Sequence, residues 1–211
     1  MSLRLDRKLA TRRALLDAAL ALMAEGRSFG TLSLREVARA AQVVPTAFYR
    51  HFHDMDELGL VLVDETFLTL RRLLREVRQV ARGADTMGAE SVRVCLGYVR
   101  AHRPVFEFIT RERHGGTPAI RAAIAREVRF CTTELADDLG GIPRLSHLGR
   151  ERLELVAHLI VSAVVTLVGD LFDVPPGPGS EDAEAALARR TATQLVLLTE
   201  GAAIWQPVAA R

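Results

Sequence analysis

The chain is poor in cysteine and in aromatic side chains. Its 211 residues include two cysteines, Cys95 and Cys131, and aromatic residues make up 5% of the sequence. Two cysteines are too few for the disulfide framework of a small secreted domain, and we interpret both as small buried hydrophobes. No segment alternates polar and apolar residues over the length of a strand, whereas apolar residues recur with a helical period almost throughout. We therefore predict an all-α fold with an aliphatic core.

The sequence also lacks the motifs of common catalytic and cofactor sites. It contains no Gly-x-Ser-x-Gly motif, no glycine-rich phosphate loop and no Cys/His spacing typical of zinc. One helical face carries four residues with metal-binding chemistry, namely His147, Glu151, Glu154 and His158. Such a stripe is more often a polar edge than a metal site. We expect no enzyme activity, no metal and no cofactor.

The segment 33–58 has the pattern of a helix, a tight turn, a second short helix and the start of a third. Ser33 and Glu36 have the spacing of a capping box, which predicts a helix start at Ser33. Pro45 suits the first position of the next helix, where the missing N–H costs nothing. Asp54 and Glu57 form a second cap signal. This is the layout of a helix-turn-helix, whose second helix enters the major groove of DNA.

The spacing within the second helix separates a buried side from a DNA-facing side. Phe48 and Phe52 are four residues apart and point inward, so their neighbours are left to face outward. Side chains with donors can contact phosphate oxygens, whereas the leading end of the helix can reach base edges. The predicted DNA-contacting residues are Ser33, Arg35, Val44, Pro45, Thr46, Tyr49, Arg50 and His51. A solvated or packed His51 is an equal alternative.

The charge is unevenly distributed along the chain. The net charge is only +2, but residues 1–53 carry +5 and the remainder −3. A basic end joined to a slightly acidic remainder is typical of a DNA-binding domain attached to a separate body. The first residues hold a basic cluster of Arg4, Arg7, Lys8, Arg12 and Arg13. It forms either an arm or first turn along the DNA backbone, or a solubilising tail.

We predict two domains and about nine helices. Residues 1–53 form the helix-turn-helix DNA-binding domain, and residues 54–211 form a ligand-binding and dimerisation domain. Outside the helix-turn-helix, apolar periodicity and breakers predict helices over residues 7–25, 54–82, 87–102, 118–140, 149–172 and 181–205, and a short helix after Pro104 that ends at Arg113. Gly83 is expected to end the second of these helices, and Pro104 to break the third.

The penultimate predicted helix is apolar on almost every side. Between Leu155 and Val168 only His158, Ser162 and Thr166 interrupt it, and this run is shorter than the roughly 20 residues of a membrane span. A helix that is apolar all round is buried all round. We expect this helix and the last one to pair with a second copy as a four-helix bundle, giving a homodimer; the alternative is a monomer core. With no signal peptide or lipidation motif, we expect a cytoplasmic protein without a membrane partner.

These residues resemble the tetracycline-repressor (TetR) family of bacterial transcription factors. Ser33 stands at the family's cap position, Val37-Ala38 at its Ile-Ala, and Ala41 at its small residue before the turn. The residues Phe48, Tyr49, His51 and Phe52 match its Leu-Tyr-x-His-Phe recognition helix, and Leu58 matches a core leucine. The resemblance implies a ligand-responsive homodimeric repressor that binds a palindromic operator in double-stranded DNA.

Three positions depart from that family pattern. Gln42 occupies a turn position that is usually glycine, and a positive φ there would cost about 1 kcal/mol. Val44-Pro45 replaces the usual Ser-Lys-type start of the recognition helix. Met55 stands where many members carry a phosphate-binding lysine.

A narrower resemblance is to the FabR/DesT branch of the family, on residues 44–65 and 110–116. It implies a long-chain acyl-CoA effector and control of fatty-acid synthesis or desaturation genes. An apolar slot for the acyl chain is predicted from Phe67, Leu70, Leu74, Leu96, Val99, Phe106, Phe108 and Ile109, with Arg111, Arg113 and His114 near the CoA phosphates. Ordinary core packing and solvated helix ends are the alternatives for these residues taken singly.

Two other functions stay open from the sequence. The first is a TetR-type repressor of an efflux or catabolic gene that senses another hydrophobic small molecule. The second is an enzyme or lipid carrier whose first domain does not bind DNA, and for this the sequence offers no catalytic motif.

Overall fold

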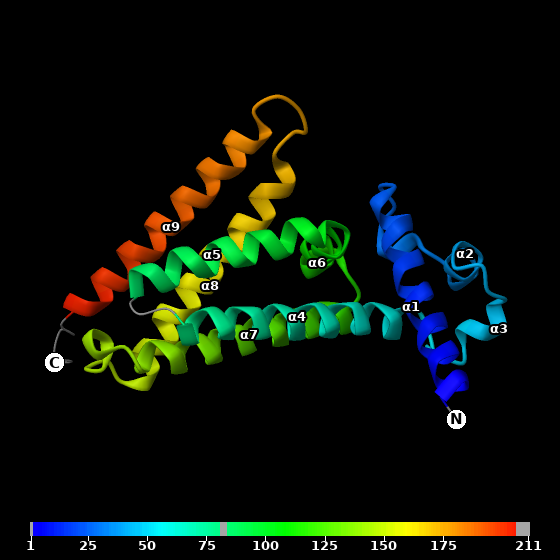
Figure 1. Ribbon diagram of the computed structural model, residues 1–211, viewed down its shortest axis with the longest axis horizontal. Coiled ribbons are helices and arrows are strands. Elements are labelled where there is room, and N and C mark those ends of the chain that lie inside the picture. The colour runs from blue at the N-terminus through cyan, green and yellow to red at the C-terminus, as the bar shows by residue number, and fades with distance from the viewer. Residues whose placement is uncertain (1, 81–83, 206–211) are drawn as a thin grey trace. The chain divides into compact units, whose positions relative to one another are not determined.

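The computed structural model describes residues 2–80 and 84–205, with side chains for 5–78 and 88–205. Throughout these ranges the secondary structure is helical, which confirms the all-α prediction (Figure 1). The α-helices are α1 (Ser2–Ala24), α2 (Leu34–Ala40), α3 (Pro45–Phe48), α4 (Met55–Val80), α5 (Ala84–Ala101), α6 (Arg103–Gly115), α7 (Pro118–Gly140), α8 (Arg150–Asp173) and α9 (Ser180–Ile204), with short 3₁₀ helices η1 (Phe29–Thr31) and η2 (Pro143–Leu145).

The helix boundaries differ from the predictions where the local signal is weak. α1 begins at Ser2 rather than at Arg7, and neither 3₁₀ turn was predicted, because three residues carry no periodicity. Pro104 does not itself break α5: the helix ends at Ala101, and Pro104 lies in the first turn of α6. That position tolerates proline, since the first N–H groups of a helix have no partner within it. Gly83, the predicted end of α4, lies outside the described residues.

The chain forms two compact units. The first contains the chain up to Leu68 together with His102–Arg126, and the second contains Thr69–Ala101 together with the chain from Glu127 onward. The first unit therefore includes α6 and the start of α7 as well as the helix-turn-helix, because α6 packs against α1. The functional division at residue 53 stays a prediction.

A close fit around Phe29 joins three parts of the first unit. The Phe29 and Phe108 rings lie 4.9 Å apart between centroids, so η1 contacts α6. On α4, a Cβ atom at Gly59 would lie 2.9 Å from side-chain atoms of both Phe29 and Ile120. Real Cβ atoms are not found so close to other atoms, so glycine is required here for space rather than for its backbone conformation.

In the second unit, α8 and α9 form a helical hairpin that α5 packs against (Figure 1). Its core is aliphatic, as predicted: Leu139, Leu145 and Leu167 are almost completely buried. Cys95 is buried and Cys131 is half-buried, and both thiols are free. Burial raises the pKa of Cys95 to about 12 and that of Cys131 to about 11, so neither is a ready nucleophile.

The turn between α2 and α3 has the geometry of a Schellman motif. Val43 N–H donates to Ala38 O at 2.9 Å, and Gln42 N–H donates to Arg39 O at 3.0 Å. Gln42 itself has a φ of +57°, the left-handed conformation that glycine usually adopts. The cost foreseen from the sequence at this position is therefore present.

We expect Gln42→Gly to stabilise the protein by about 1 kcal/mol, because glycine adopts a positive φ without a Cβ clash. Urea unfolding followed by circular dichroism measures this, with Gln42→Ala as the control that keeps the Cβ and changes stability little. A glycine variant less stable than the wild type would contradict the proposed strain.

Candidate nucleic-acid interface

The start of α2 is fixed by a reciprocal cap. Glu36 N–H donates to Ser33 Oγ at 3.3 Å, and Ser33 N–H donates to Glu36 Oε2 at 2.9 Å, so the predicted capping box is present. Arg27 also pairs with Glu36, at 2.9 Å. The hydrogen bond from Arg27 is the largest cause, and those from Ser33 come next, of the lowering of the Glu36 pKa to about 2. The Ser33 hydroxyl donates to Glu36 Oε2 as well, so its predicted contact with DNA would require this bond to break or to be shared.

The short helix α3 is held by two buried rings. Phe48 and Phe52 are 0% and 1% exposed, and their centroids lie 5.6 Å apart. Val44 is the N-cap residue and Pro45 occupies the first turn, as predicted. Because the rings fix the inner side, the opposite side is solvent-facing. The exposed residues there are Val44, Pro45, Thr46, Tyr49 and Arg50, which is the predicted orientation. Arg35 of α2 is exposed too.

His51 is only partly exposed, which agrees with the packed position that the sequence left open as an alternative. The chain leaves the helix after Phe48, and the His51 side chain turns partly inward: it is half-buried, and its buried Nδ1 has no hydrogen-bond partner among the described residues. Arg12 of α1 donates to the His51 carbonyl at 3.3 Å and lies over the Phe52 ring at 4.8 Å. Burial lowers the pKa of His51, and the nearby cations Lys8, Arg12 and Arg50 lower it further.

The basic cluster of the first residues is part of a helix rather than an extended arm, because α1 already begins at Ser2. Arg7 and Lys8 are exposed, and the side chain of Arg4 lies outside the described residues. Arg13 instead pairs with Asp17 at 3.1 Å and with Glu65 at 3.7 Å. Lys8, Arg12 and Arg50 lie close enough to His51 to lower its pKa, and only the fold reveals this proximity.

The start of α4 carries the second predicted cap. Asp54 Oδ1 accepts from Glu57 N–H at 2.8 Å, and Glu57 accepts from the His53 N–H. His53 is fully exposed and its ring lies 3.0 Å from Asp54, which raises the pKa of His53. This cap ends the helix-turn-helix and sets the direction in which α4 leaves it.

The predicted ligand-binding residues are divided between the two units. Seven of the apolar residues are buried and Leu74 is half-buried. Phe67, Phe106, Phe108 and Ile109 belong to the first unit with Arg111, Arg113 and His114, whereas Leu70, Leu74, Leu96 and Val99 belong to the second. The Phe108 ring contacts Phe29, so at least this residue has a packing role. One shared slot for an acyl chain stays a prediction.

Glu112 is a buried acid that the sequence did not single out. It is 8% exposed and lies on α6 between the predicted phosphate-contacting residues Arg111 and Arg113. Burial raises its pKa, and the charge of Arg111 opposes that shift. Gly116 leaves space for its carboxylate, because a Cβ there would lie 2.8 Å from Glu112 Oε2.

A hollow of about 520 Å³ lies in the second unit at the loop that joins α8 and α9. Asp170, Asp173, Leu187 and Arg190 contribute to its lining, and Arg190 pairs with Asp170 at 2.6 Å. None of the predicted ligand-binding residues lines it. No cluster of three or more metal-ligating side chains occurs in the parts of the chain that the structure describes, and the His147 to His158 stripe is exposed.

α8 and α9 leave large apolar side chains exposed. Leu155 and Leu159 on α8 are 51% and 44% exposed, and Leu197 and Ile204 on α9 are 67% and 81% exposed. α8 is long and apolar enough to cross a membrane by length and composition, a test that core helices of other proteins also pass. Exposed apolar surface of this kind marks an interaction site.

Comparison with known proteins agrees with this geometry. The family model described as bacterial regulatory proteins, tetR family, matches residues 15–60, and the model described as tetracyclin repressor-like, C-terminal domain, matches residues 85–199. The first match contains the whole helix-turn-helix, from its cap at Ser33 to Leu58.

Several solved structures share the fold. The fatty acid degradation regulator FadR from Bacillus halodurans superimposes with a TM-score of 0.73 at 16% identity, covering 90% of this chain and 95% of that one. FadR from Bacillus subtilis, in complex with stearoyl-CoA, superimposes with a TM-score of 0.70 at 16% identity, covering 90% of this chain and 98% of that one. A transcriptional regulator from Rhodococcus sp. Rha1 gives 0.67 at 20% identity over 94% and 99%.

At these identities the solved structures show the fold alone, and the family assignment depends on the two matched models. Members of this family are generally DNA-binding regulators and not enzymes. Since the C-terminal model covers more than half of the sequence and the N-terminal model covers the helix-turn-helix, the chain belongs to the TetR family of bacterial transcriptional regulators.

Proposed function

We propose that the protein is a homodimeric repressor that binds a near-palindromic operator and responds to a long-chain acyl-CoA. The observation that carries the DNA-binding part is the exposed face of α3, where Val44, Thr46 and Tyr49 point to solvent beside the cations Lys8, Arg12 and Arg50. Cations neutralise phosphates irrespective of sequence, whereas the leading residues of the helix read base edges.

A second copy of the chain is the proposed partner of the exposed face of α8 and α9. The face is a stripe of apolar side chains at helical spacing, with Leu155 and Leu159 on one helix and Leu197 and Ile204 on the other. Two such hairpins related by a two-fold axis bury both stripes as a four-helix bundle. A dimer would then present two recognition helices about 34 Å apart, one turn of DNA, which accounts for a palindromic site.

The proposed effector is a long-chain acyl-CoA, and the proposed targets are genes of fatty-acid synthesis or desaturation. Three observations support this: the residues that resemble the FabR/DesT branch, the aliphatic residues of α4, α5 and α6, and the likeness in fold to FadR regulators, one of which was solved with stearoyl-CoA. The effector acts by binding one arrangement of the dimer better than the other, because a ligand with equal affinity for both shifts nothing.

Glu112 favours a second candidate, a repressor of an efflux or catabolic gene with a different hydrophobic effector. When it is ionised, a buried carboxyl between Arg111 and Arg113 opposes the binding of CoA phosphates to this region. A neutral or cationic hydrophobic molecule would meet no such penalty.

For DNA binding, we expect Arg50→Ala to weaken affinity for all sequences alike and to reduce the salt slope by about 0.9, one phosphate contact. Val44→Ser should instead change affinity at one or two base pairs of the operator, because that side chain lies at the leading end of α3. Fluorescence anisotropy with operator variants at several salt concentrations measures both. Arg129→Ala, which changes an exposed residue of α7, is the control. Equal losses for Arg129→Ala and Arg50→Ala would refute the interface.

For dimerisation, Leu197→Glu should shift the protein toward monomer, because it buries a charge in the centre of the proposed bundle. Sedimentation equilibrium gives the dissociation constant, and circular dichroism confirms that the variant is folded. Leu68→Glu changes a leucine of similar exposure, 63%, that lies outside α8 and α9 and should leave the dimer intact. A dimeric Leu197→Glu protein would place the interface elsewhere.

For the effector, we expect palmitoyl-CoA to raise the melting temperature in a concentration-dependent way and to change operator affinity. A ligand at 100 times its dissociation constant adds about 2.7 kcal/mol to stability. Differential scanning fluorimetry with palmitoyl-CoA, free CoA and uncharged hydrophobic compounds measures the shift. Stabilisation by the uncharged compounds and not by palmitoyl-CoA would select the second candidate.

A further inference from the structure

A histidine and three cations meet where α1 contacts the residues that follow α3. Arg12 Nη1 donates to the His51 carbonyl oxygen at 3.3 Å, and the Arg12 guanidinium lies 4.8 Å from the centroid of the Phe52 ring. Lys8 is one turn before Arg12 on α1, so both side chains lie on the same face of that helix. Arg50 is the residue before His51. We call Lys8, Arg12, Arg50 and His51 the His51 cluster.

The His51 cluster has exposed cations around a partly enclosed ring. Lys8 and Arg50 are exposed, whereas His51 is half-buried and its Nδ1 atom is buried without a hydrogen-bond partner among the described residues. All four residues belong to the first unit. Arg50 is also one of the exposed residues of the proposed DNA interface, so a bound duplex would bring a backbone phosphate close to the cluster.

This environment disfavours a positive charge on the imidazole ring. A charged imidazole carries a hydrogen on both ring nitrogens, so it would bury an N–H at Nδ1 without an acceptor. The charges that act on the ring are those of Lys8 and Arg12 from α1 and of Arg50 beside it, and no carboxylate is among them. Burial, followed by these charges, lowers the pKa of His51 below its ordinary value. His51 is therefore mostly neutral at neutral pH while no DNA is bound.

A backbone phosphate would shift this balance toward the charged ring. Its negative charge, placed against Lys8 and Arg50, attracts an imidazolium and offsets the repulsion from the three cations. The coupling is reciprocal by thermodynamic necessity. If a phosphate favours the proton on His51, the proton favours the phosphate by the same factor.

We propose that the His51 cluster is one phosphate site, and that His51 takes up a proton when a phosphate of the DNA backbone occupies it. This inference rests on the proposed DNA-binding function and adds to it a dependence on pH. The DNA-bound protein then holds more protons than the free protein, so affinity rises as the pH falls. The rise is confined to the range between the pKa of His51 in the free protein and its higher pKa in the complex. Acidification would therefore strengthen repression.

The test uses a labelled duplex of about 20 base pairs and arbitrary sequence at low salt, because phosphate contacts do not depend on sequence. Fluorescence anisotropy at constant ionic strength should show affinity rising about threefold to tenfold from about pH 8 to about pH 5.5, the effect of a shift of up to one pKa unit. His51→Gln should bind like the wild type at the upper pH, where His51 is neutral, and should lack the rise. Isothermal titration calorimetry in buffers of different ionisation enthalpy should show proton uptake that this variant loses.

His53→Gln is the matched control, because His53 is two residues further along, is exposed, and is paired with Asp54 instead of lying among cations. This variant should keep the pH dependence of the wild type. Melting temperatures check the folding of each variant.

Three results would refute the proton-linked site and leave the DNA-binding function standing: a wild type with equal affinity at every pH, a His51→Gln variant that keeps the wild-type pH dependence, or one that loses affinity equally across the range. If the wild type binds no duplex at any pH, the DNA-binding function falls. NMR of the His51 ring with and without sodium sulfate then decides, because sulfate resembles phosphate in shape and does not titrate in this range. A pKa raised by sulfate supports the anion site, and an unchanged pKa overturns it.

Discussion

The burial of Phe48 and Phe52 is the interaction on which the proposed DNA-facing side depends. α3 is four residues long, far below the length at which a helix is stable in water by itself. Its position is therefore set by tertiary contacts: the two rings packed against each other inside, and Arg12 over the Phe52 ring. Tyr49 and Thr46 are presented to solvent only because the rings on the opposite side are held. Any substitution that loosens these rings would disturb the proposed DNA interface without touching a residue that is proposed to contact DNA.

Features set by local sequence were predictable, and those set by contacts across the fold were not. The caps at Ser33 and Asp54 and the helix start at Pro45 depend on residues three or fewer positions apart, and the structure contains all three. The positive φ of Gln42 had entered the prediction only as a condition, because the TetR family usually has glycine at that turn position. The surroundings of His51 were not predictable, because Arg12 and Lys8 approach it from about forty residues away in the sequence.

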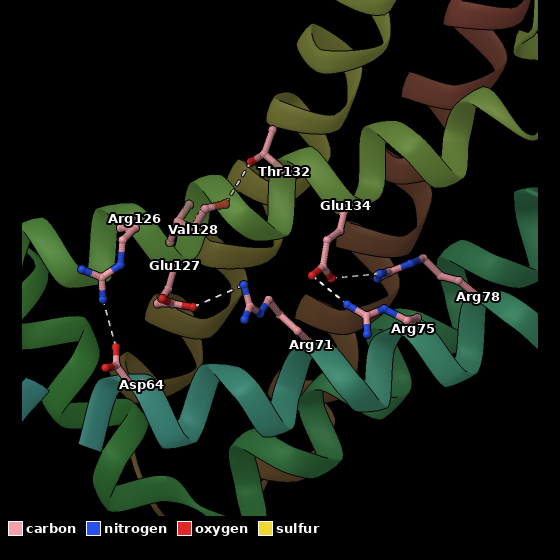
Figure 2. A network of polar contacts seen from close by, with 9 residues as sticks. All are labelled: Asp64, Arg71, Arg75, Arg78, Arg126, Glu127, Val128, Thr132 and Glu134. Carbon is pink, nitrogen blue, oxygen red and sulfur yellow. Dashed lines mark hydrogen bonds and ion pairs between the residues drawn. The ribbon is translucent and has the colours of Figure 1, made fainter. Parts of the chain in front are cut away.

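The same distinction applies to the body. Apolar periodicity predicted which residues of α4, α5 and α6 are buried, but not what they touch: Phe108 contacts Phe29, a residue of the N-terminal segment. The ion pairs between arginines of α4 and acids of α7, such as Arg71 with Glu127 and Arg75 with Glu134, were not predicted (Figure 2). Arginine and glutamate at helical spacing normally indicate a solvated face. Arg78 and Glu127 are buried because each meets an opposite charge on another helix, and no pattern within one helix reveals that. Likewise, the burial of Glu112 was not predicted, because the charged residues Arg111 and Arg113 on either side of it indicate a solvated segment.

The missing side chain at Gly59 has a mechanical consequence. Phe29 and Ile120 both have side-chain atoms 2.9 Å from the place where a Cβ would be, so η1 and the beginning of α7 pack closely against α4 at this point. Well-packed interiors transmit strain because they are nearly incompressible. Any side chain at position 59 would therefore have to displace Phe29 or Ile120, and a shift of Phe29 would disturb the Phe108 ring that it contacts on α6.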